Sequence, residues 1–471
     1  MNKLLTILIL AATTTATAQS DRTTQIQQLL KENNLPGIQL VYTHDALTEV
    51  YNLGTTGDST RPVTSNTIFE AASLSKCVFA YIVLRLYDRN QIDLDQPLLS
   101  YLGSYDRFDP KDHRYTQITA RMVLHHTTGL PNWGDSDYAR LRFPPDSCFS
   151  YSGEGYMFLQ HTIEKITGKT LDELAQQEVF TPLHMTSSSY IWQPRFDSVS
   201  AFGNSPQAIK DHMDPGAAFS LLTNAHDYTL FVKALAGGTG LKHSTWHMMM
   251  LPGVAAGWLD KPSTEATGHI HWGLGVGLED AAANDQRGPA FWHWGDNGSF
   301  KAYYVVYPKT HESLVYFVHQ WRGLFITQQL ADIFFGKQPQ WGILWSGEGY
   351  QSPWSVNDFR TALEQQGYDN VTKIHDQLEA KGEQLSEHDL NEYGFVLMDL
   401  RQPKDAVAVF RLNLTLHPQS ANAFDSMVEG YEALGEKSLA LENFKQSLQR
   451  NPKNDYAAKH IKELQTSLST Q

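Results

Sequence analysis

The sequence has little cysteine, a deficit of positive charge and no long apolar run, and each shortage excludes a class of protein. Two cysteines in 471 residues, Cys77 and Cys148, are too few for a disulfide scaffold or a multi-cysteine zinc module. The 37 basic residues stand against 51 acidic ones, and the formal charge of −14 disfavours binding to nucleic acid or to an anionic membrane surface. No stretch reaches the ~20 apolar residues that a membrane-spanning helix needs.

What is present points to packed domains. The hydrophobic fraction is 41% and the aromatic fraction 11%, which excludes a disordered or collagen-like chain. A chain of 471 residues is longer than one hydrophobic core supports, so we expect two or three domains.

Residues 1–18 have the three parts of a secretory signal peptide. Lys3 gives a positive start, Leu4–Ala12 form an apolar run, and Ala16-Thr17-Ala18 place small residues before a cleavage point. The alternative, a membrane anchor, is disfavoured because the run is too short to span a bilayer. We therefore predict a secreted protein of the bacterial periplasm that does not span the membrane.

A repeat marks the other end of the chain. Four small, aromatic, aliphatic and proline positions recur with a period of 34 residues: Ala406, Phe410, Leu414 and Pro418 return as Ala440, Phe444, Leu448 and Pro452. This pattern resembles the tetratricopeptide repeat, a helix–turn–helix unit. We predict two such repeats over 386–467, a possible binding site for a protein partner, preceded by a linker and helical hairpin over 338–385, with Gln338–Pro353 as the linker proper.

The remaining residues, 19–337, predict one α/β (α+β) domain. Alternating segments at its start, Gly37–Thr43 and Leu47–Leu53, and at its end, Ala302–Tyr307 and Ser313–His319, read as strands, and helices lie between them. This order indicates an antiparallel sheet closed by N- and C-terminal strands and flanked by helices.

The first chemical motif is Ser73-x-x-Lys76, at the start of a segment that is apolar nearly all round. Residues three apart share one face of a helix, so Ser73 and Lys76 are predicted side by side. A serine hydroxyl needs a base within hydrogen-bond reach, and a desolvated lysine can serve as that base. Ser-x-x-Lys alone is a weak signal, but a lysine in an apolar helix needs a partner.

Two later segments strengthen this motif: Tyr151-Ser152-Gly153 before a helix, and His293-Trp294-Gly295 before the strand at Ala302. Their order resembles that of the class C β-lactamase-related serine hydrolases and penicillin-binding proteins, over about 300 residues. Supporting stretches are Ile92–Pro97, Val123–Pro131 and Ala217–Asp227.

The resemblance implies a role for each motif residue. Ser73 would be the nucleophile that forms an acyl-enzyme, Lys76 would accept or hold its proton, and Tyr151 would pass a proton to the leaving group. The backbone N–H groups of Ser73 and Asp296 would form the oxyanion hole. Gly153, Trp294 and Gly295 complete the predicted substrate-binding residues, and His293 occupies the place of the family's lysine. No cofactor and no metal are implied.

Two departures from the family pattern bear on the substrate. Gly153 stands where relatives usually carry the asparagine that binds a substrate acylamide, and His293 replaces a permanent positive charge. His293 could orient Tyr151 or meet a substrate carboxylate, with a charge that depends on pH. The departures favour an ester or a D-amino-acid amide or peptide as substrate, with a β-lactamase or D-alanyl-D-alanine carboxypeptidase as the alternative. A plain alternative for Gly153 is a turn that needs unusual backbone angles.

Other candidates carry less weight. The pairs His125-His126 and His269-x-His271 invite a metal reading, but no ordered ligand spacing accompanies them, and His125 is assigned a structural place in the family signature. Cys77 and Cys148 could form a disulfide or remain two buried thiols. Trp133, Trp192 and Trp294 lie near motif segments and could wall a cleft.

Two classes of function remain open from the sequence. One is an acyl-serine hydrolase with a helical appendage. The other is a binding protein built on a catalytically retired hydrolase fold, with the repeats as its working part. Intact Ser73, Lys76 and Tyr151 favour the enzyme.

Overall fold

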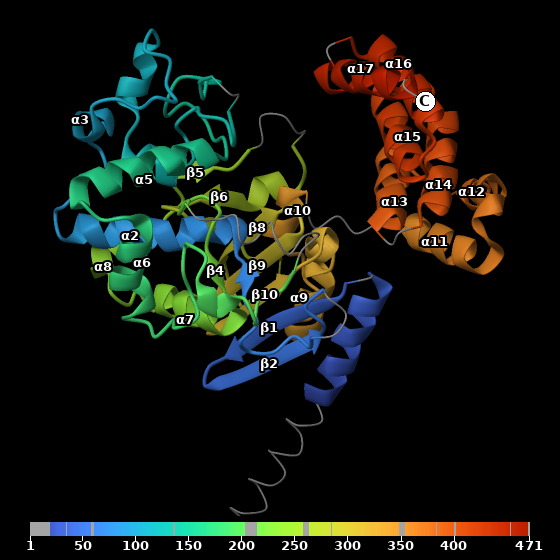
Figure 1. Cartoon of the computed structure of the whole chain (residues 1–471). Coiled ribbons are helices and arrows are strands. Elements are labelled where there is room, and N and C mark those ends of the chain that lie inside the picture. The colour runs from blue at the N-terminus through green and yellow to red at the C-terminus, as the bar shows by residue number, and fades with distance from the viewer. Residues whose placement is uncertain are drawn as a thin grey trace, which may run out of the picture. The chain divides into compact units, whose positions relative to one another are not determined.

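A computed structural model describes most of the chain, and its contacts divide it into two compact units, Met1–Tyr350 and Gln351–Gln471 (Figure 1). The described residues are 19–33, 35–57, 61–134, 137–202, 214–257, 263–283, 285–347, 354–382, 384–399, 402–452 and 454–469. Residues 1–18, on which the signal-peptide prediction rests, lie outside them.

The first unit is built on an eight-stranded antiparallel sheet with the strand order β2-β1-β10-β9-β8-β7-β6-β5. The strands are β1 (Gly37–His44), β2 (Leu47–Gly54), β5 (Val254–Ala255), β6 (Ile270–Trp272), β7 (Gly277–Glu279), β8 (Ala290–Asn297), β9 (Phe300–Tyr307) and β10 (Glu312–Val318). The N-terminal strand β1 pairs with the C-terminal strand β10, so the chain ends of the domain close the sheet as predicted.

Hairpin turns set the register of the outer strands. Asp45 and His311 have φ values of 51° and 53° at the β1–β2 and β9–β10 turns, the left-handed conformation that tight hairpins require. With the register fixed in this way, Leu40 lies between Tyr51 and Tyr316 on one face of the sheet. Both faces of β1, β9 and β10 are buried, so apolar residues follow one another without a polar face.

Helices cover both faces of the sheet (Figure 1). They are α2 (Ser75–Asp88), α3 (Leu99–Leu102), α4 (Ala120–Leu124), α5 (Gly153–Thr167), α6 (Leu171–Ala175), α7 (Ala225–Ala236), α8 (His243–Met249), α9 (Thr327–Phe335) and α10 (Trp341–Ser346), with a further helix over 19–32. One core joins α2, α5 and α7 to one face; the other joins helix 19–32, α9 and α10 to the opposite face.

Helix α10 corrects the predicted linker. The Trp- and Gly-rich stretch from Gln338 was expected to connect two domains, yet Trp341, Ile343 and Trp345 are buried in the core of the first unit. The indole N–H of Trp345 donates to the carbonyl of Ala256 at 2.5 Å. The sequence misleads here because glycine is typical of flexible linkers, whereas Gly342 is needed for close packing: a Cβ there would lie 2.3 Å from the Trp292 ring.

The second unit consists of helices α11 (Trp354–Gln366), α12 (Val371–Glu379), α13 (Glu387–Asp399), α14 (Pro403–Leu416), α15 (Ala421–Ala433), α16 (Lys437–Arg450) and α17 (Asp455–Ser469). The two copies of the 34-residue pattern fall on α14 and α16, and their alanine and phenylalanine positions are buried. A Cβ at Gly394 would lie 2.1 Å from the Phe410 ring, which explains a glycine where α13 meets α14.

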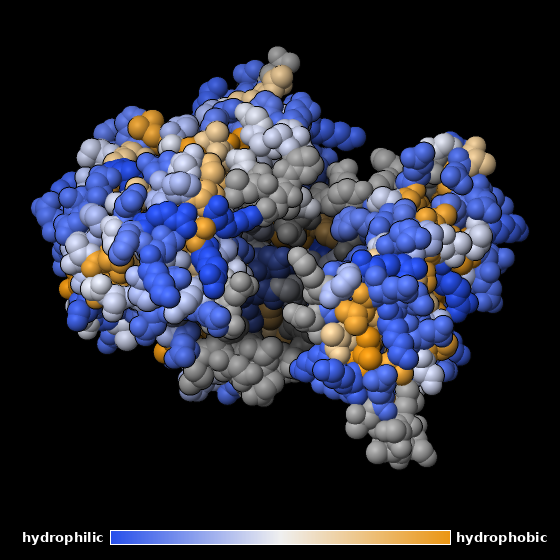
Figure 2. Space-filling model, turned by 90° about the horizontal axis from the view of Figure 1, so that it is seen from above, coloured by the Kyte–Doolittle hydropathy of each residue, from blue (hydrophilic) through white to orange (hydrophobic). Residues whose placement is uncertain are grey.

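The two units also differ in surface. Figure 2 shows orange side chains scattered over the first unit and gathered into a patch on the visible face of the second. Across the described residues, no helix combines the length and apolar character needed to cross a membrane.

Candidate active site

Ser73 sits on a short turn between a strand and a buried helix. The strand β3 (Phe69–Glu70) pairs with β4 (Leu222–Thr223), and the turn η1 (Ala72–Leu74) leads directly into α2. Ala72 has a φ of 49°, a backbone conformation that alanine rarely adopts, directly before the predicted nucleophile. Ser73 is half-buried among buried neighbours, so its hydroxyl can be reached from solvent.

Lys76 is fully enclosed beside Ser73. Its Nζ donates to the Ser73 Oγ at 3.0 Å and to the carbonyl oxygen of Ala218 at 2.8 Å. Burial lowers the pKa of Lys76 to about 7, because the cation loses its hydration and no carboxylate of the described residues compensates. Near neutral pH a large fraction of Lys76 is therefore an uncharged amine at hydrogen-bond distance from the serine.

Tyr151 lies on the other side of Ser73, just before α5. The Ser152 hydroxyl caps α5 by accepting from the N–H of Gly155 at 2.9 Å, which fixes the backbone after Tyr151. Burial raises the pKa of Tyr151 well above its usual value, and a hydrogen bond with Ser73 acts in the opposite direction. Lys76 Nζ lies 4.9 Å from the centre of the Tyr151 ring. The structure thus brings Ser73, Lys76 and Tyr151 together.

His126 holds Tyr151 in place, a role that no sequence motif indicates. Its carbonyl accepts from the N–H of Ser150 at 2.7 Å, and its Nδ1 accepts from the N–H of Ser152 at 3.0 Å. The two residues flanking Tyr151 are therefore tied to one histidine, whose ring centre lies 4.4 Å from that of Tyr151. The family signature was matched with His125 as its structural histidine. The geometry gives this role to His126 instead.

The third motif lies on β8, next to the serine turn. Strand β7 pairs with Ala290–Trp292, and beyond that point Gly295 faces η1. A Cβ at Gly295 would lie 2.4 Å from the carbonyl oxygen of Ala71, so only glycine permits this close approach. The following residue, Asp296, forms an ion pair with Lys301 at 2.5 Å. The backbone of β8 therefore runs past Ser73, as the oxyanion-hole prediction requires.

His293 lies beside Tyr151, with ring centres 6.0 Å apart, so its place is compatible with orienting that residue. Its side chain is fully buried, which disfavours direct contact with a substrate carboxylate. Its Nδ1 donates to the carbonyl of Trp294 at 2.7 Å, which leaves Nε2 without a proton and, among the described residues, without a hydrogen-bond partner. Burial and the neighbouring Lys76 lower the pKa of His293 to about 3. The charge of His293 therefore does not change with pH near neutrality, contrary to expectation, because desolvation favours the neutral ring.

Two further site predictions are corrected by packing. Trp294 was expected at the substrate, but its ring packs against Tyr151, with ring centres 4.8 Å apart, and against Trp292 and Trp345 in the core. Gly153 does not adopt the left-handed conformation that the turn explanation requires. It is required for space, because a Cβ there would lie 2.9 Å from the Trp133 ring and from the carbonyl oxygen of Asn132.

The two cysteines and the pair His269 and His271 add no reactive group to this arrangement. Cys77 and Cys148 are both free thiols, and the Cys77 Sγ accepts from the Tyr304 hydroxyl at 3.3 Å. Burial raises the pKa of Cys77 to about 12, which leaves the thiol protonated and unreactive. His269 and His271 both face Asp280 at distances of 3.9 and 3.6 Å, an exposed pairing away from Ser73.

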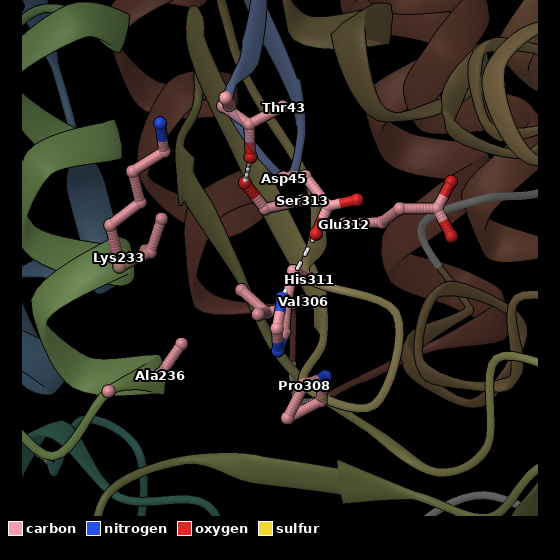
Figure 3. A pocket seen from close by; sticks show the side chains of 12 residues that line it. Thr43, Asp45, Lys233, Ala236, Val306, Pro308, His311, Glu312 and Ser313 are labelled. Carbon is pink, nitrogen blue, oxygen red and sulfur yellow. Dashed lines mark hydrogen bonds and ion pairs between the residues drawn. The ribbon is translucent and has the colours of Figure 1, made fainter.

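A separate cavity of about 570 Å³ lies between the ends of β1 and β10 and helix α7 (Figure 3). Its polar residues pair with one another: the Thr43 and Ser313 hydroxyls are 2.6 Å apart, and His311 Nδ1 lies 3.0 Å from Asp45. None of the predicted site residues lines this cavity, so it is distinct from the Ser73 site.

The fold and the adjoining Ser73, Lys76 and Tyr151 are those of an active-site-serine hydrolase. A family model described as Beta-lactamase matches residues 23–331, well over half of the chain. The chain therefore belongs to the β-lactamase family, whose members with this fold are serine hydrolases.

Individual relatives agree with this membership. Penicillin-binding protein 4 of Amycolatopsis lactamdurans is 26% identical over 317 residues, which are 59% of this chain and 80% of the relative. Esterase EstB of Burkholderia gladioli is 27% identical over 182 residues, 32% of this chain and 45% of the relative. A solved β-lactamase/D-alanine carboxypeptidase from Pseudomonas syringae superposes with a TM-score of 0.56 at 17% identity, over 68% of this chain and 100% of that chain.

Proposed function

We propose that this protein is an exported serine hydrolase that cleaves an ester or a D-amino-acid amide or peptide through an acyl-serine intermediate. The observation that carries the proposal is the contact of 3.0 Å between a solvent-reachable serine and a buried lysine whose pKa is about 7. A neutral amine at that distance accepts the serine proton as the hydroxyl attacks a carbonyl.

The residues divide the reaction as follows. Lys76 takes the proton of Ser73, and the backbone N–H groups of Ser73 and Asp296 stabilise the oxyanion. Tyr151, whose neutral hydroxyl is favoured by burial, donates a proton to the leaving group. Lys76 passes the proton that it took from Ser73 back to Tyr151, and water then hydrolyses the acyl-serine bond by adding its hydroxyl to the acyl carbon and its proton to the Ser73 Oγ. Donors aimed at an oxyanion typically contribute a factor of about 10² or more to the rate.

Two observations favour an ester or amide over a β-lactam. The residue in the place of the family lysine is a buried, neutral histidine, so this position supplies no charge for a substrate carboxylate. Gly153 supplies no side-chain amide. The esterase, penicillin-binding and carboxypeptidase names among the relatives keep β-lactamase and D-alanyl-D-alanine carboxypeptidase activity as the second candidate.

Export and partner binding complete the proposal. The pattern of residues 1–18 supports secretion to a bacterial periplasm, and the 34-residue period supports a tetratricopeptide-like helical unit that holds a protein partner. Cleavage before Gln19, read by N-terminal sequencing of the mature protein from a bacterial host, tests the first of these.

The test of the reaction is covalent. A fluorophosphonate probe should label the wild-type protein on Ser73, identified by mass spectrometry of the labelled peptide, and Ser73→Ala should remain unlabelled. A panel of nitrocefin, short p-nitrophenyl esters and D-amino-acid anilides then ranks the substrate classes. A wild-type protein that neither labels nor hydrolyses any of them would be a retired hydrolase fold, and the proposal would be wrong.

A further inference from the structure

Trp133 is an exposed tryptophan that the structure holds rigidly beside the active site. Its side chain is 52% exposed, although a large aromatic ring gains most when it is buried. The chain next to it is anchored on both sides. Asn132 accepts backbone N–H bonds from Gly153 and Glu154 at 3.0 Å, and the N–H of Gly134 donates to the Glu154 carboxylate at 3.0 Å.

The anchoring group is itself fixed. Glu154 is buried in the first turn of α5 and forms an ion pair with Arg107 at 2.5 Å. The Asn132 side chain adds a third tie, since its Oδ1 accepts from the N–H of Gly153 at 3.0 Å. The indole of Trp133 is thus exposed while the backbone that carries it is bound to the same turn that positions Tyr151.

The indole occupies the space of the missing side chain at position 153. A Cβ on Gly153 would lie 2.9 Å from Trp133 Cζ2 and Cη2, so the ring lies where a residue 153 side chain would begin. A side-chain amide at this point would bind an acylamide, whereas an indole face binds a flat apolar group. The exchange of an amide for a ring therefore changes the chemistry of acyl recognition.

Phe219 faces Trp133 from the opposite segment. The two rings meet edge to face, with centres 5.8 Å apart. Phe219 follows Ala218, whose carbonyl holds Lys76, and its own carbonyl accepts from the Asn297 side chain at 3.3 Å. Its ring lies close over Gly216, where a Cβ would come within 2.6 Å. Trp133 and Phe219 therefore approach each other from the tyrosine side and the lysine side of Ser73.

Space is available on one side of Trp133. Trp133 lines a cavity of about 630 Å³ together with Tyr105 and Met157, and the charged Asp106, Arg107 and Glu154 also border it. The two aromatic rings and the thioether form an apolar, polarizable part of this wall that suits an aromatic or flat apolar group.

We propose that Trp133 and Phe219 form an aromatic wall that selects substrates whose acyl group carries a flat apolar or aromatic ring, with Gly153 present to admit the indole. This inference rests on the proposed acyl-serine reaction and adds the substrate class. It places the preference on the acyl side, not on the leaving group, because Trp133 packs against the segment after Tyr151 in the place of the acylamide-binding amide.

The test compares two esters with the same leaving group, p-nitrophenyl phenylacetate and p-nitrophenyl acetate. We expect kcat/KM of the wild-type protein to favour phenylacetate by at least about tenfold, a factor that one or two aromatic contacts supply. Trp133→Ala and Phe219→Ala should each reduce this ratio several-fold, and Trp133→Phe should retain most of it. Leu47→Ala, which removes an apolar side chain that is 41% exposed on β2, is the matched control and should leave the ratio unchanged.

Fluorophosphonate labelling of every variant distinguishes a failure of aromatic recognition from a failure of the acyl-serine reaction. A wild-type protein that labels on Ser73 but hydrolyses both esters equally, or a Trp133→Ala variant with the wild-type ratio, overturns the aromatic wall and leaves the reaction standing. A preference for the p-nitrophenyl ester of N-acetyl-D-alanine over phenylacetate also overturns the aromatic wall, because an acylamide would then be the recognised group. Absence of labelling in the wild-type protein overturns the reaction itself.

Discussion

The two units of this chain bury polar side chains for different purposes. In the helical unit, buried polar groups tie helices together: Asn413 on α14 donates to the carbonyl of Glu387 at 3.0 Å, and Ser426 on α15 bonds to Asn391 on α13. In the first unit, Lys76, His126 and His293 are fully enclosed around one serine, and burial lowers the pKa of all three.

This difference shows that the residues that lower the free energy of unfolding lie around Ser73. A buried hydrogen bond between helices adds a modest net stabilisation, whereas an enclosed lysine without a carboxylate reduces the free energy of unfolding. Local rules of folding are commonly broken at functional sites and obeyed elsewhere. The predictions below test whether the chemistry belongs to the first unit and the simple packing to the second.

The largest effect is expected from Ser73→Ala. Removal of the nucleophile should lower ester hydrolysis by at least about 10³-fold, because binding and oxyanion stabilisation alone retain little of the rate. The melting temperature should stay close to that of the wild type, since the half-buried hydroxyl is lost without a large cavity. Covalent label on Ser75 or Ser152 in the wild-type protein would contradict the assignment.

Lys76→Met should reduce kcat/KM by at least about 10²-fold through loss of the base. In the wild type, kcat/KM should rise with pH and level off above about 7, since the amine acts only when neutral. The free energy of unfolding should also rise with pH. The folded pKa lies below the unfolded one, so the unfolded chain holds an extra proton between about pH 7 and 10.5, and stability rises with pH through this window.

The cost of burying the Lys76 cation also predicts how Lys76→Met changes the melting temperature. A methionine of similar length carries no charge to desolvate, so the variant should melt at a higher temperature than the wild type at pH 7 and should lose the pH dependence in that window. A variant with wild-type activity, or a wild-type rate without an acidic limb near pH 7, would refute the role of base.

Where the first unit ends is testable by truncation. A protein ending at Tyr350 should fold and keep its rate on a small ester within about twofold, because the residues around Ser73 described above all precede that point. A protein ending at Lys337 lacks α10 and with it three buried residues, Trp341, Ile343 and Trp345. Loss of one such large side chain typically costs about 3–5 kcal/mol, so the shorter protein should be unfolded or melt far lower.

Circular dichroism measures whether each truncated protein is folded, and turnover on p-nitrophenyl acetate measures its activity. If the protein ending at Tyr350 is folded but inactive, the helical unit contributes to the active site and the separation of the units is wrong. If the protein ending at Lys337 is as stable as the longer one, α10 is dispensable.

His293→Lys restores the residue type of the family motif in a buried place. His293 and Lys76 interact electrostatically, so a second cation at this position should lower the pKa of that lysine further. The acidic limb of the pH–rate profile should therefore move below 7, and the melting temperature should fall. An unmoved limb would show that the two side chains do not interact.

The smallest effect on activity is expected in the helical unit. Phe444→Ala removes a side chain that packs with Val428, Ala440 and Ala457, and should destabilise this unit by about 3 kcal/mol. Ester hydrolysis should remain at the wild-type rate. A change in turnover in this variant would show that the two units are energetically coupled.

Patterns that depend on residues close together in the sequence determined much of the secondary structure of this protein. The alternation at Gly37–Thr43 and Ser313–His319 predicted strands of the sheet, and the Ser73-x-x-Lys76 spacing placed two side chains on one side of a turn, because strand and helix periods are local properties of the backbone. The regular period of 34 residues likewise predicted equivalent helices at α14 and α16.

Tertiary structure alone decided the surroundings of those residues. His293 is neutral because the core around it excludes water, and no motif records how deeply a strand residue is covered. His126 holds Tyr151, Gly153 admits the ring of Trp133, and α10 belongs to the core of the first unit, each through contacts between segments separated in sequence. Local periodicity specifies which residues share a face, whereas desolvation and steric room depend on every neighbour that the fold brings close.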